Sequence, residues 1–267
     1  MRQSKTIKLL PTSIVNPMPV RKKTQKAPGQ GMTSKQKKRR KPIDEAYMIP
    51  VEPLTHNQQV FFDEWDKGKM IYAYGVAGTG KTFVALYKAL KDVLNEYTPY
   101  EKIYIVRSLV ATREIGFLPG DHEDKSSLYQ IPYKNMVQSM FEMPDDASYD
   151  MLYDNLKAQE TISFWSTSFI RGTTLDNSIV IIDECQNLNF HELDSIITRI
   201  GQDSKIIFCG DASQTDLTKI SERTGIIDFQ RILQNMEEFS LIEFDIEDIV
   251  RSGIVKSYLI NKINLGL

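Results

Sequence analysis

Residues 70–90 read MIYAYGVAGTGKTFVALYKAL and contain the strongest fold signal in the chain. Its first residues, Met70 to Tyr74, are an apolar run rich in β-forming side chains, and the run ends at Gly75. Residues 75–82 fit the pattern G-x-x-x-x-G-K-[ST], and a helix-like segment follows directly. A phosphate-binding loop requires a strand, a glycine loop and a helix in this order. The stretch therefore predicts a nucleotide site.

The residue types of this loop suit phosphate binding. Gly75, Gly78 and Gly80 let backbone N–H groups turn inward around phosphate oxygens, which side chains would block. Lys81 would reach the β- and γ-phosphates and Thr82 would place its hydroxyl on Mg2+, while the helix N-terminus adds positive potential. The alternative is a glycine-rich turn with an exposed lysine. The strand and the helix on either side favour the nucleotide site.

Composition places the chain among soluble globular proteins. Apolar residues make up 41% of its 267 residues and charged residues 25%, enough for a core and for a solvated surface. No apolar run approaches the ~18 residues that could span a membrane, and the N-terminus lacks the apolar stretch of a signal peptide. We expect Cys185 and Cys209, in apolar runs, to be buried free thiols in a reducing cytoplasm. The protein is therefore predicted to be cytoplasmic.

Charge is unevenly distributed along the chain. The net charge is −2, but residues 1–43 contain 13 Lys or Arg and no Asp or Glu. They also hold five prolines and little hydrophobic pattern, so we predict a flexible basic arm at 1–43 and one folded domain at 44–267. Such an arm can contact nucleic-acid phosphates without recognising base sequence. The alternative is a solubilising leader without a partner.

Strand-like and helix-like segments alternate after the arm. This alternation predicts an α/β domain with a parallel sheet and helices on both faces. A long polar segment at 107–129, with glycines and a proline in its centre, predicts an irregular loop. The expected strands are 70–74, 102–106, 161–164, the apolar start of 178–187, 205–209 and 239–244. The expected helices are 54–66, 83–96, 132–143, 149–159, 191–200 and 246–262.

Two carboxylates, Asp183 and Glu184, end the apolar run that starts at Ser178. Asp183 would hold Mg2+, directly or through water, and Glu184 would orient or deprotonate the attacking water. An acidic pair at a strand end is commonly just the start of a solvated loop, but the phosphate loop upstream favours the catalytic interpretation. Asp211 and Gln214 would point at the same site if the strands at 178 and 205 are neighbours. The alternative for them is a polar turn.

Seven segments follow one another along the chain: GVAGTGKT, REIGFLPGDHEDK, FIRGTTL, IIDECQN, TRIG, GDASQTDL and EDIVRSGIV. In order and approximate spacing they resemble the PhoH family of bacterial and phage P-loop ATPases, which is related to the first motor domain of superfamily 1 helicases. The resemblance covers residues 54–262 and leaves the basic arm outside. It implies a RecA-like P-loop NTPase domain, ATP and Mg2+ as cofactors, and a bacterial or phage-infected host cytoplasm.

The resemblance also implies roles for matching residues. Gln58 falls where related helicases recognise adenine, and Gln214 resembles their γ-phosphate sensor. Arg251 lies where they keep an arginine that touches the phosphates. Because a lone motor domain cannot close a nucleotide cleft, the resemblance implies a homo-oligomeric ring such as a hexamer, with Arg251 acting across a subunit boundary. Arg107, Arg171 and Arg199 also lie on matching segments, but they are weaker candidates for a role in the site. The chain departs from the family at Arg107–Ser108, where arginine–proline is usual.

The implied site has three groups of residues. The catalytic residues are Lys81, Glu184, Gln214 and Arg251, and the metal residues are Thr82 and Asp183. The nucleotide-contacting residues are Gln58, Gly75, Val76, Ala77, Gly78, Thr79, Gly80, Lys81, Thr82 and Phe83.

Together these features predict a Mg2+-dependent ATPase that couples hydrolysis to binding or moving along RNA or single-stranded DNA. The arm and the 107–129 loop are the expected nucleic-acid contacts. One alternative is a nucleotide-gated binding or assembly protein with slow hydrolysis. Another is a small-molecule or nucleoside kinase, but we find no segment with the arginines of a kinase lid.

Overall fold

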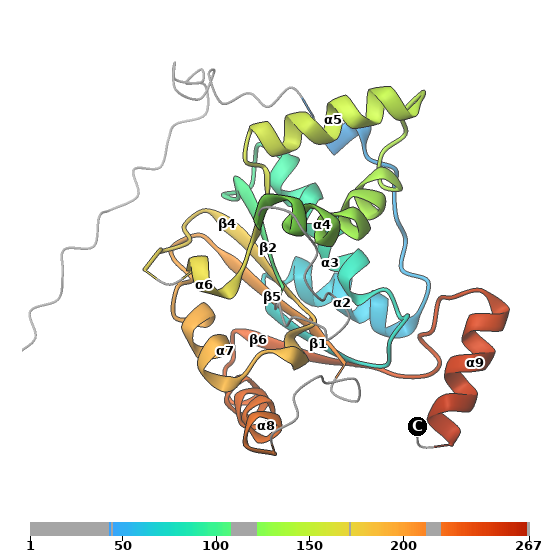
Figure 1. Cartoon of the computed structure of the whole chain (residues 1–267), viewed down its shortest axis with the longest axis vertical. Helices are drawn as coiled ribbons and strands as arrows, with labels where there is room; N and C mark the ends of the chain where they lie inside the picture. Colours follow the sequence, from blue (N-terminus) through green and yellow to red (C-terminus); the bar gives the residue numbers. More distant parts are fainter. Residues whose placement is uncertain (1–42, 44, 108–121, 171, 212–219, 266–267) are drawn as a thin grey trace, which may run out of the picture. The chain divides into compact units, whose positions relative to one another are not determined.

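A sheet of six parallel strands organises the described part of the chain (Figure 1). The structure is a computed structural model that describes residues 43, 45–107, 122–170, 172–211 and 220–265. The predicted basic arm and most of the 107–129 loop lie outside these residues. The strands are β1 (Met70–Gly75), β2 (Lys102–Arg107), β3 (Ile162–Trp165), β4 (Ser178–Asp183), β5 (Lys205–Gly210) and β6 (Phe239–Phe244). All six were predicted, with bounds that differ by a few residues at most.

The strands lie in the order β3-β2-β4-β5-β1-β6. β4 and β5 are buried along their whole length, which explains their continuous apolar runs. Because every pair is parallel, all six strands end at the same edge of the sheet. The prediction of a parallel α/β sheet is confirmed.

Helices cover both faces of the sheet, as predicted (Figure 1). Alternate residues of a strand face opposite sides, so Ile179 and Ile181 of β4 join one apolar cluster while Val180 and Ile182 join the other. The first face carries α2 (His56–Asp66), α3 (Lys81–Leu94), α4 (His122–Gln138) and α5 (Asp146–Ala158). The second carries α6 (Thr167–Ile170), α7 (Phe190–Ile197) and α8 (Ile220–Gln234).

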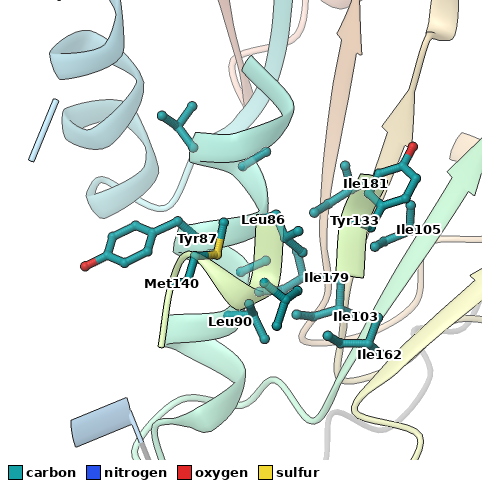
Figure 2. Packing of buried hydrophobic residues seen from close by; sticks show 14 of the residues in the cluster. Leu86, Tyr87, Leu90, Ile103, Ile105, Tyr133, Met140, Ile162, Ile179 and Ile181 are labelled. Atoms are coloured by element: carbon teal, nitrogen blue, oxygen red, sulfur yellow. The ribbon is translucent and has the colours of Figure 1, made fainter. Parts of the chain in front are cut away.

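Figure 2 shows the first cluster, where Leu86 and Leu90 of α3 lie against isoleucines of the central strands. Two short 3-10 turns, Glu45–Tyr47 and Cys185–Asn187, and a last helix, α9 (Gly253–Asn264), complete the described elements. Cys185 and Cys209 are buried and unpaired, as expected. No helix in the described ranges is both long and apolar enough to cross a membrane.

Helix α4 differs from its prediction. It begins at His122, so the predicted irregular loop ends before Tyr129, and it finishes at Gln138 rather than Met143. Pro132, which we expected to start the helix, lies inside it. Proline lacks the N–H of an ordinary helical residue, which is why a sequence pattern favours it at the first turn.

Helices α8 and α9 also differ from the sequence analysis, which predicted no element at 220–234. α8 contains Gly225, a weak helix former, and a Cβ at that position would lie 2.9 Å from Phe190 Cβ of α7. Close packing between helices therefore explains the glycine. α9 begins at Gly253 rather than at 246, because Asp248 Oδ2 accepts bonds from Asp245 N and Asn57 Nδ2 and holds the preceding segment as a turn.

Candidate active site

The predicted site residues meet where the central strands end. β5 lies between β4 and β1, so Asp183, Gly210 and Gly75 come to one edge of the sheet. The condition for Asp211 to face the site of Asp183 is therefore met, because their strands are neighbours. Asp211 is buried there. Gln214 lies outside the described residues.

The glycine loop has the backbone that its sequence predicts. Gly75, Gly78 and Gly80 have φ angles of 114°, 79° and 82°, a region that residues with a Cβ rarely adopt. A Cβ on Gly75 would lie 2.0 Å from the carbonyl oxygen of Phe244. The same oxygen accepts a hydrogen bond from Val76 N at 2.9 Å. Gly80 caps α3 without a side-chain bond, which leaves the first N–H groups of the helix for a ligand.

Lys81 is folded into this loop. Its Nζ donates to the carbonyl oxygens of Gly75 at 2.9 Å and Val76 at 2.7 Å, and to Thr79 Oγ1 at 3.2 Å. Burial lowers the pKa of Lys81, and the nearby carboxylates, including Asp211, oppose that shift. The ammonium group is thus held by oxygen acceptors, the kind of partner that a phosphate would also offer.

Thr82 and Asp183 form the candidate Mg2+ site. Thr82 Oγ1 donates to Asp183 Oδ1 at 2.6 Å, and Tyr133 Oη donates to Asp183 Oδ2 at 2.5 Å. A hydroxyl and a carboxylate are the hard oxygen ligands that Mg2+ prefers. The described residues contain no cluster of three or more His, Cys, Asp or Glu side chains that could hold a metal. Mg2+ is usually held by one or two protein ligands together with substrate phosphates.

Glu184 has an unusual backbone and a hydrogen-bonded side chain. Its φ of 53° is in the left-handed region, a conformation that costs a non-glycine residue about 1–3 kcal/mol and clusters at functional sites. Gln186 Nε2 donates to Glu184 Oε2 at 2.6 Å, and Gln186 Oε1 accepts from Asp211 N at 3.0 Å. Arg107 Nη2 lies 4.0 Å from Glu184 Oε1. The carboxylate is therefore oriented from two sides.

Gln58 is buried on α2 and ties that helix to the loop. Its Nε2 donates to Thr79 O at 2.9 Å and its Oε1 accepts from Leu54 N at 2.8 Å. Each end of the amide keeps one further bonding position, so adenine recognition by Gln58 stays a prediction. Thr55 caps α2 by accepting a bond from Gln58 N at 3.3 Å.

Arg251 lies beside the loop of its own chain. A Cβ built on Gly78 would be 3.0 Å from Arg251 Cγ and 3.4 Å from its Nε, and Val250 N donates to Gly78 O at 3.1 Å. The segment before α9 thus contacts the phosphate loop directly. The expectation that Arg251 acts across a subunit boundary stays a prediction.

The remaining predicted residues are placed as follows. Val76 and Ala77 are half-buried in the loop, and Phe83, in the first turn of α3, packs partly against the first apolar cluster. Arg199 lies just after α7, where its carbonyl oxygen accepts from Leu175 N at 2.9 Å. Arg171 lies outside the described residues.

Sequence reasoning missed two residues of the site, Tyr133 and Gln186. Gln186 stands two residues after Glu184, and that spacing could have drawn attention to it. Tyr133 gave no signal, because a tyrosine on an amphipathic helix is ordinarily a core residue and its distance from Asp183 along the chain is 50 residues.

Comparison with known proteins agrees with this geometry. Residues 50–261 match the family described as PhoH-like protein. The chain belongs to the PhoH family. Its fold is a parallel α/β sheet in which the glycine loop joins β1 to α3 and the two carboxylates follow β4.

PhoH relatives with curated sequences are longer than the matched part. The PhoH-like protein of Bacillus subtilis (strain 168) is 33% identical over 210 residues, which cover 75% of this chain and 60% of the relative. Protein PhoH of Escherichia coli (strain K12) is 29% identical over 212 residues, 79% of this chain and 57% of the relative. The chain therefore spans less than two thirds of the length of these relatives.

Among solved structures, the large terminase of a thermophilic bacteriophage in complex with ADP is similar. The match covers 77% of this chain and 49% of the terminase chain, at 14% identity and a TM-score of 0.47. A likeness of that size does not bear on function.

Proposed function

We propose that this chain is a Mg2+-dependent ATPase that couples ATP hydrolysis to binding or moving along RNA or single-stranded DNA. The main support is the bond of 2.6 Å between Thr82 Oγ1 and Asp183 Oδ1, which joins the phosphate loop to the end of β4. This bond brings together the hydroxyl and the carboxylate expected for Mg2+. In the sequence, Lys81 directly precedes Thr82 and Glu184 directly follows Asp183.

Each site residue then has a task in the proposed reaction. Mg2+, when bound with ATP, would neutralise phosphate charge, and Thr82 and Asp183 would hold it. Lys81 would exchange its carbonyl partners for phosphate oxygens, and the free N–H groups at the start of α3 would add donors. Glu184, oriented by Gln186, would align the attacking water. Arg251 would stabilise the charge of the transition state from within the same chain.

Coupling to nucleic acid and assembly into a homo-oligomeric ring belong to the same proposal. The 13 cationic residues within 1–43 support an electrostatic contact with phosphates that does not depend on base sequence. Such contacts weaken steeply as salt rises, so ATPase stimulation by a polymer should fall with ionic strength.

The test is ATP hydrolysis by the purified chain, with and without poly-ribonucleotide and single-stranded DNA. We expect stimulation by at least one polymer. Glu184→Gln should lower turnover by about 10²-fold or more, in the range that general acid–base groups contribute. Glu142→Gln is the matched control, because Glu142 is exposed at the surface and should leave turnover unchanged.

The possible outcomes separate the candidate functions. Turnover that neither polymer changes would leave an ATPase with a different partner. No turnover under any condition, with nucleotide still bound, would contradict the ATPase and favour a nucleotide-gated binding protein.

A further inference from the structure

Tyr133 is a buried tyrosine whose hydroxyl leaves the apolar core. The residue is 2% exposed and lies with Val137 on the buried side of α4, just before the buried Met140 that follows the helix. Figure 2 shows its ring beside Ile105 and Ile181, with the hydroxyl pointing away from both. The ring therefore belongs to the core, while the oxygen reaches the edge of the sheet where the site lies.

The hydroxyl ends on the carboxylate expected to hold the metal. Tyr133 Oη donates to Asp183 Oδ2 at 2.5 Å, while Thr82 Oγ1 donates to Oδ1 at 2.6 Å. Asp183 is 8% exposed, so little water can replace either donor. With one donor on each oxygen, the carboxylate cannot rotate without breaking a bond to a charged acceptor.

A simpler explanation is that Tyr133 only fills volume in the core. Tyr153 on the neighbouring helix α5 provides the comparison. It is 4% exposed, and its hydroxyl has no hydrogen-bond partner among the described residues. The core therefore accommodates a buried tyrosine ring whose hydroxyl has no such partner. Tyr133 differs in that its hydroxyl donates a hydrogen bond to the Asp183 carboxylate.

We propose that Tyr133 is a positioning residue of the metal site, whose hydroxyl holds the Asp183 carboxylate in the orientation that binds Mg2+ with nucleotide. This inference rests on the proposed function, because it assumes that Asp183 serves Mg2+. Outer partners of metal ligands typically change metal affinity or activity by about 10- to 100-fold when they are removed.

The experiment compares the wild-type chain with Tyr133→Phe and Tyr153→Phe. A fluorescent, slowly hydrolysed ATP analogue is titrated in EDTA, and Mg2+ is then titrated at fixed analogue concentration. Tyr133→Phe should raise the Mg2+ concentration for half-maximal binding about tenfold or more, in the range for outer partners of metal ligands, and leave affinity in EDTA unchanged. Tyr153→Phe should change neither. Circular dichroism should show the same fold in all three proteins.

The outcomes distinguish this inference from the proposed function. If Mg2+ does not change binding of the analogue to the wild-type chain, both the proposed function and the role of Tyr133 are overturned. Mg2+-dependent wild-type binding with an unchanged Mg2+ requirement in Tyr133→Phe would overturn the positioning role alone. A Tyr133→Phe protein that does not fold, while Tyr153→Phe does, would also overturn it, because the hydroxyl would then be required by the fold.

Discussion

Gly75 is the residue where fold and site depend most closely on each other. It ends β1, pairs with Phe244 of β6 and starts the phosphate loop. Its φ of 114° and the Phe244 carbonyl oxygen, 2.0 Å from where a Cβ would be, disfavour every other residue type for separate reasons. The first reason is backbone strain, and the second is a clash with backbone, which cannot move aside as a side chain can.

Gly75→Ala should therefore combine two penalties. Strain and overpacking each cost about 1–3 kcal/mol, so we expect a loss of about 3 kcal/mol or more in the free energy of unfolding. Gly68→Ala is the control, because Gly68 has a φ of 82° but nothing within 4 Å of the new Cβ. It should lose only about 1 kcal/mol from strain. Urea unfolding measures both, and equal losses would contradict the role assigned to Phe244.

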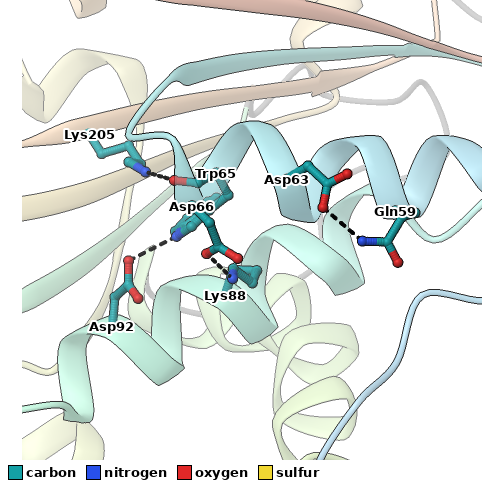
Figure 3. Close-up of polar contacts among 7 residues, drawn as sticks. All are labelled: Gln59, Asp63, Trp65, Asp66, Lys88, Asp92 and Lys205. Atoms are coloured by element: carbon teal, nitrogen blue, oxygen red, sulfur yellow. Dashed lines mark hydrogen bonds and ion pairs between the residues drawn. The ribbon is translucent and has the colours of Figure 1, made fainter.

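At the scale of elements, a polar cluster joins α2, α3 and β5 at the end of the sheet opposite the site (Figure 3). Lys205 Nζ donates to Trp65 O at 3.0 Å and lies 4.3 Å from the centre of the Trp65 ring. Trp65 Nε1 donates to Asp92 Oδ2 at 2.8 Å, and Lys88 pairs with Asp66 at 2.5 Å. These bonds hold α2 against α3, and α2 in turn carries Gln58 to the loop.

The cluster predicts a pH dependence of stability. Burial lowers the pKa of Lys205 from 10.5 to about 8; Asp92 and Asp66 oppose this and Lys88 adds to it. Between about pH 8 and pH 10.5, Lys205 therefore holds its proton more often in the unfolded chain than in the folded one. The free energy of unfolding then rises with pH across this window. From about pH 7.5 to about pH 9.5 the Lys205 contribution should rise by about 2 kcal/mol.

Urea unfolding at the two pH values measures this rise. Lys205→Met should remove it. Lys102→Met is the control and should keep the rise. Lys102 starts β2 as Lys205 starts β5, but it is paired with Glu160, which raises its pKa. An equal rise in wild type and Lys205→Met would contradict the assignment.

At the scale of the whole molecule, the C-terminal segment returns to the loop that begins the site. The bond from Val250 N to Gly78 O and the packing of Arg251 on Gly78 connect residues far apart in the sequence. We therefore expect a nucleotide on this loop to meet Arg251 of the same chain.

Mixing two inactive variants tests this arrangement. Lys81→Ala and Arg251→Ala, co-expressed, should stay inactive, because each chain lacks one of two groups that act on the same nucleotide. The separate variants are the controls, and light scattering with size-exclusion chromatography gives the oligomeric state. Recovery of ATPase activity in mixed oligomers would show that Arg251 acts across a subunit boundary.

Much of the fold could be predicted because its signals are local. Apolar runs marked the six strands, and the glycine spacing marked the loop. The start of α4 and the whole of α8 could not be predicted, because Pro132 and Gly225 disfavour helices locally while tertiary packing outweighs that preference. Asp183 and Glu184 could be found from their place after an apolar run, whereas Tyr133 could not.

The parallel α/β class, the phosphate loop and the carboxylates at the end of β4 could all be inferred from the amino-acid sequence, since each depends on residues close together in the chain. The set of groups that share the site depends instead on how distant segments pack. The strand order placed β5 between β1 and β4, the turn at Asp248 brought Arg251 to Gly78, and α4 brought Tyr133 to Asp183. Such contacts join distant parts of the chain, and their energy comes from packing and burial that no local pattern records.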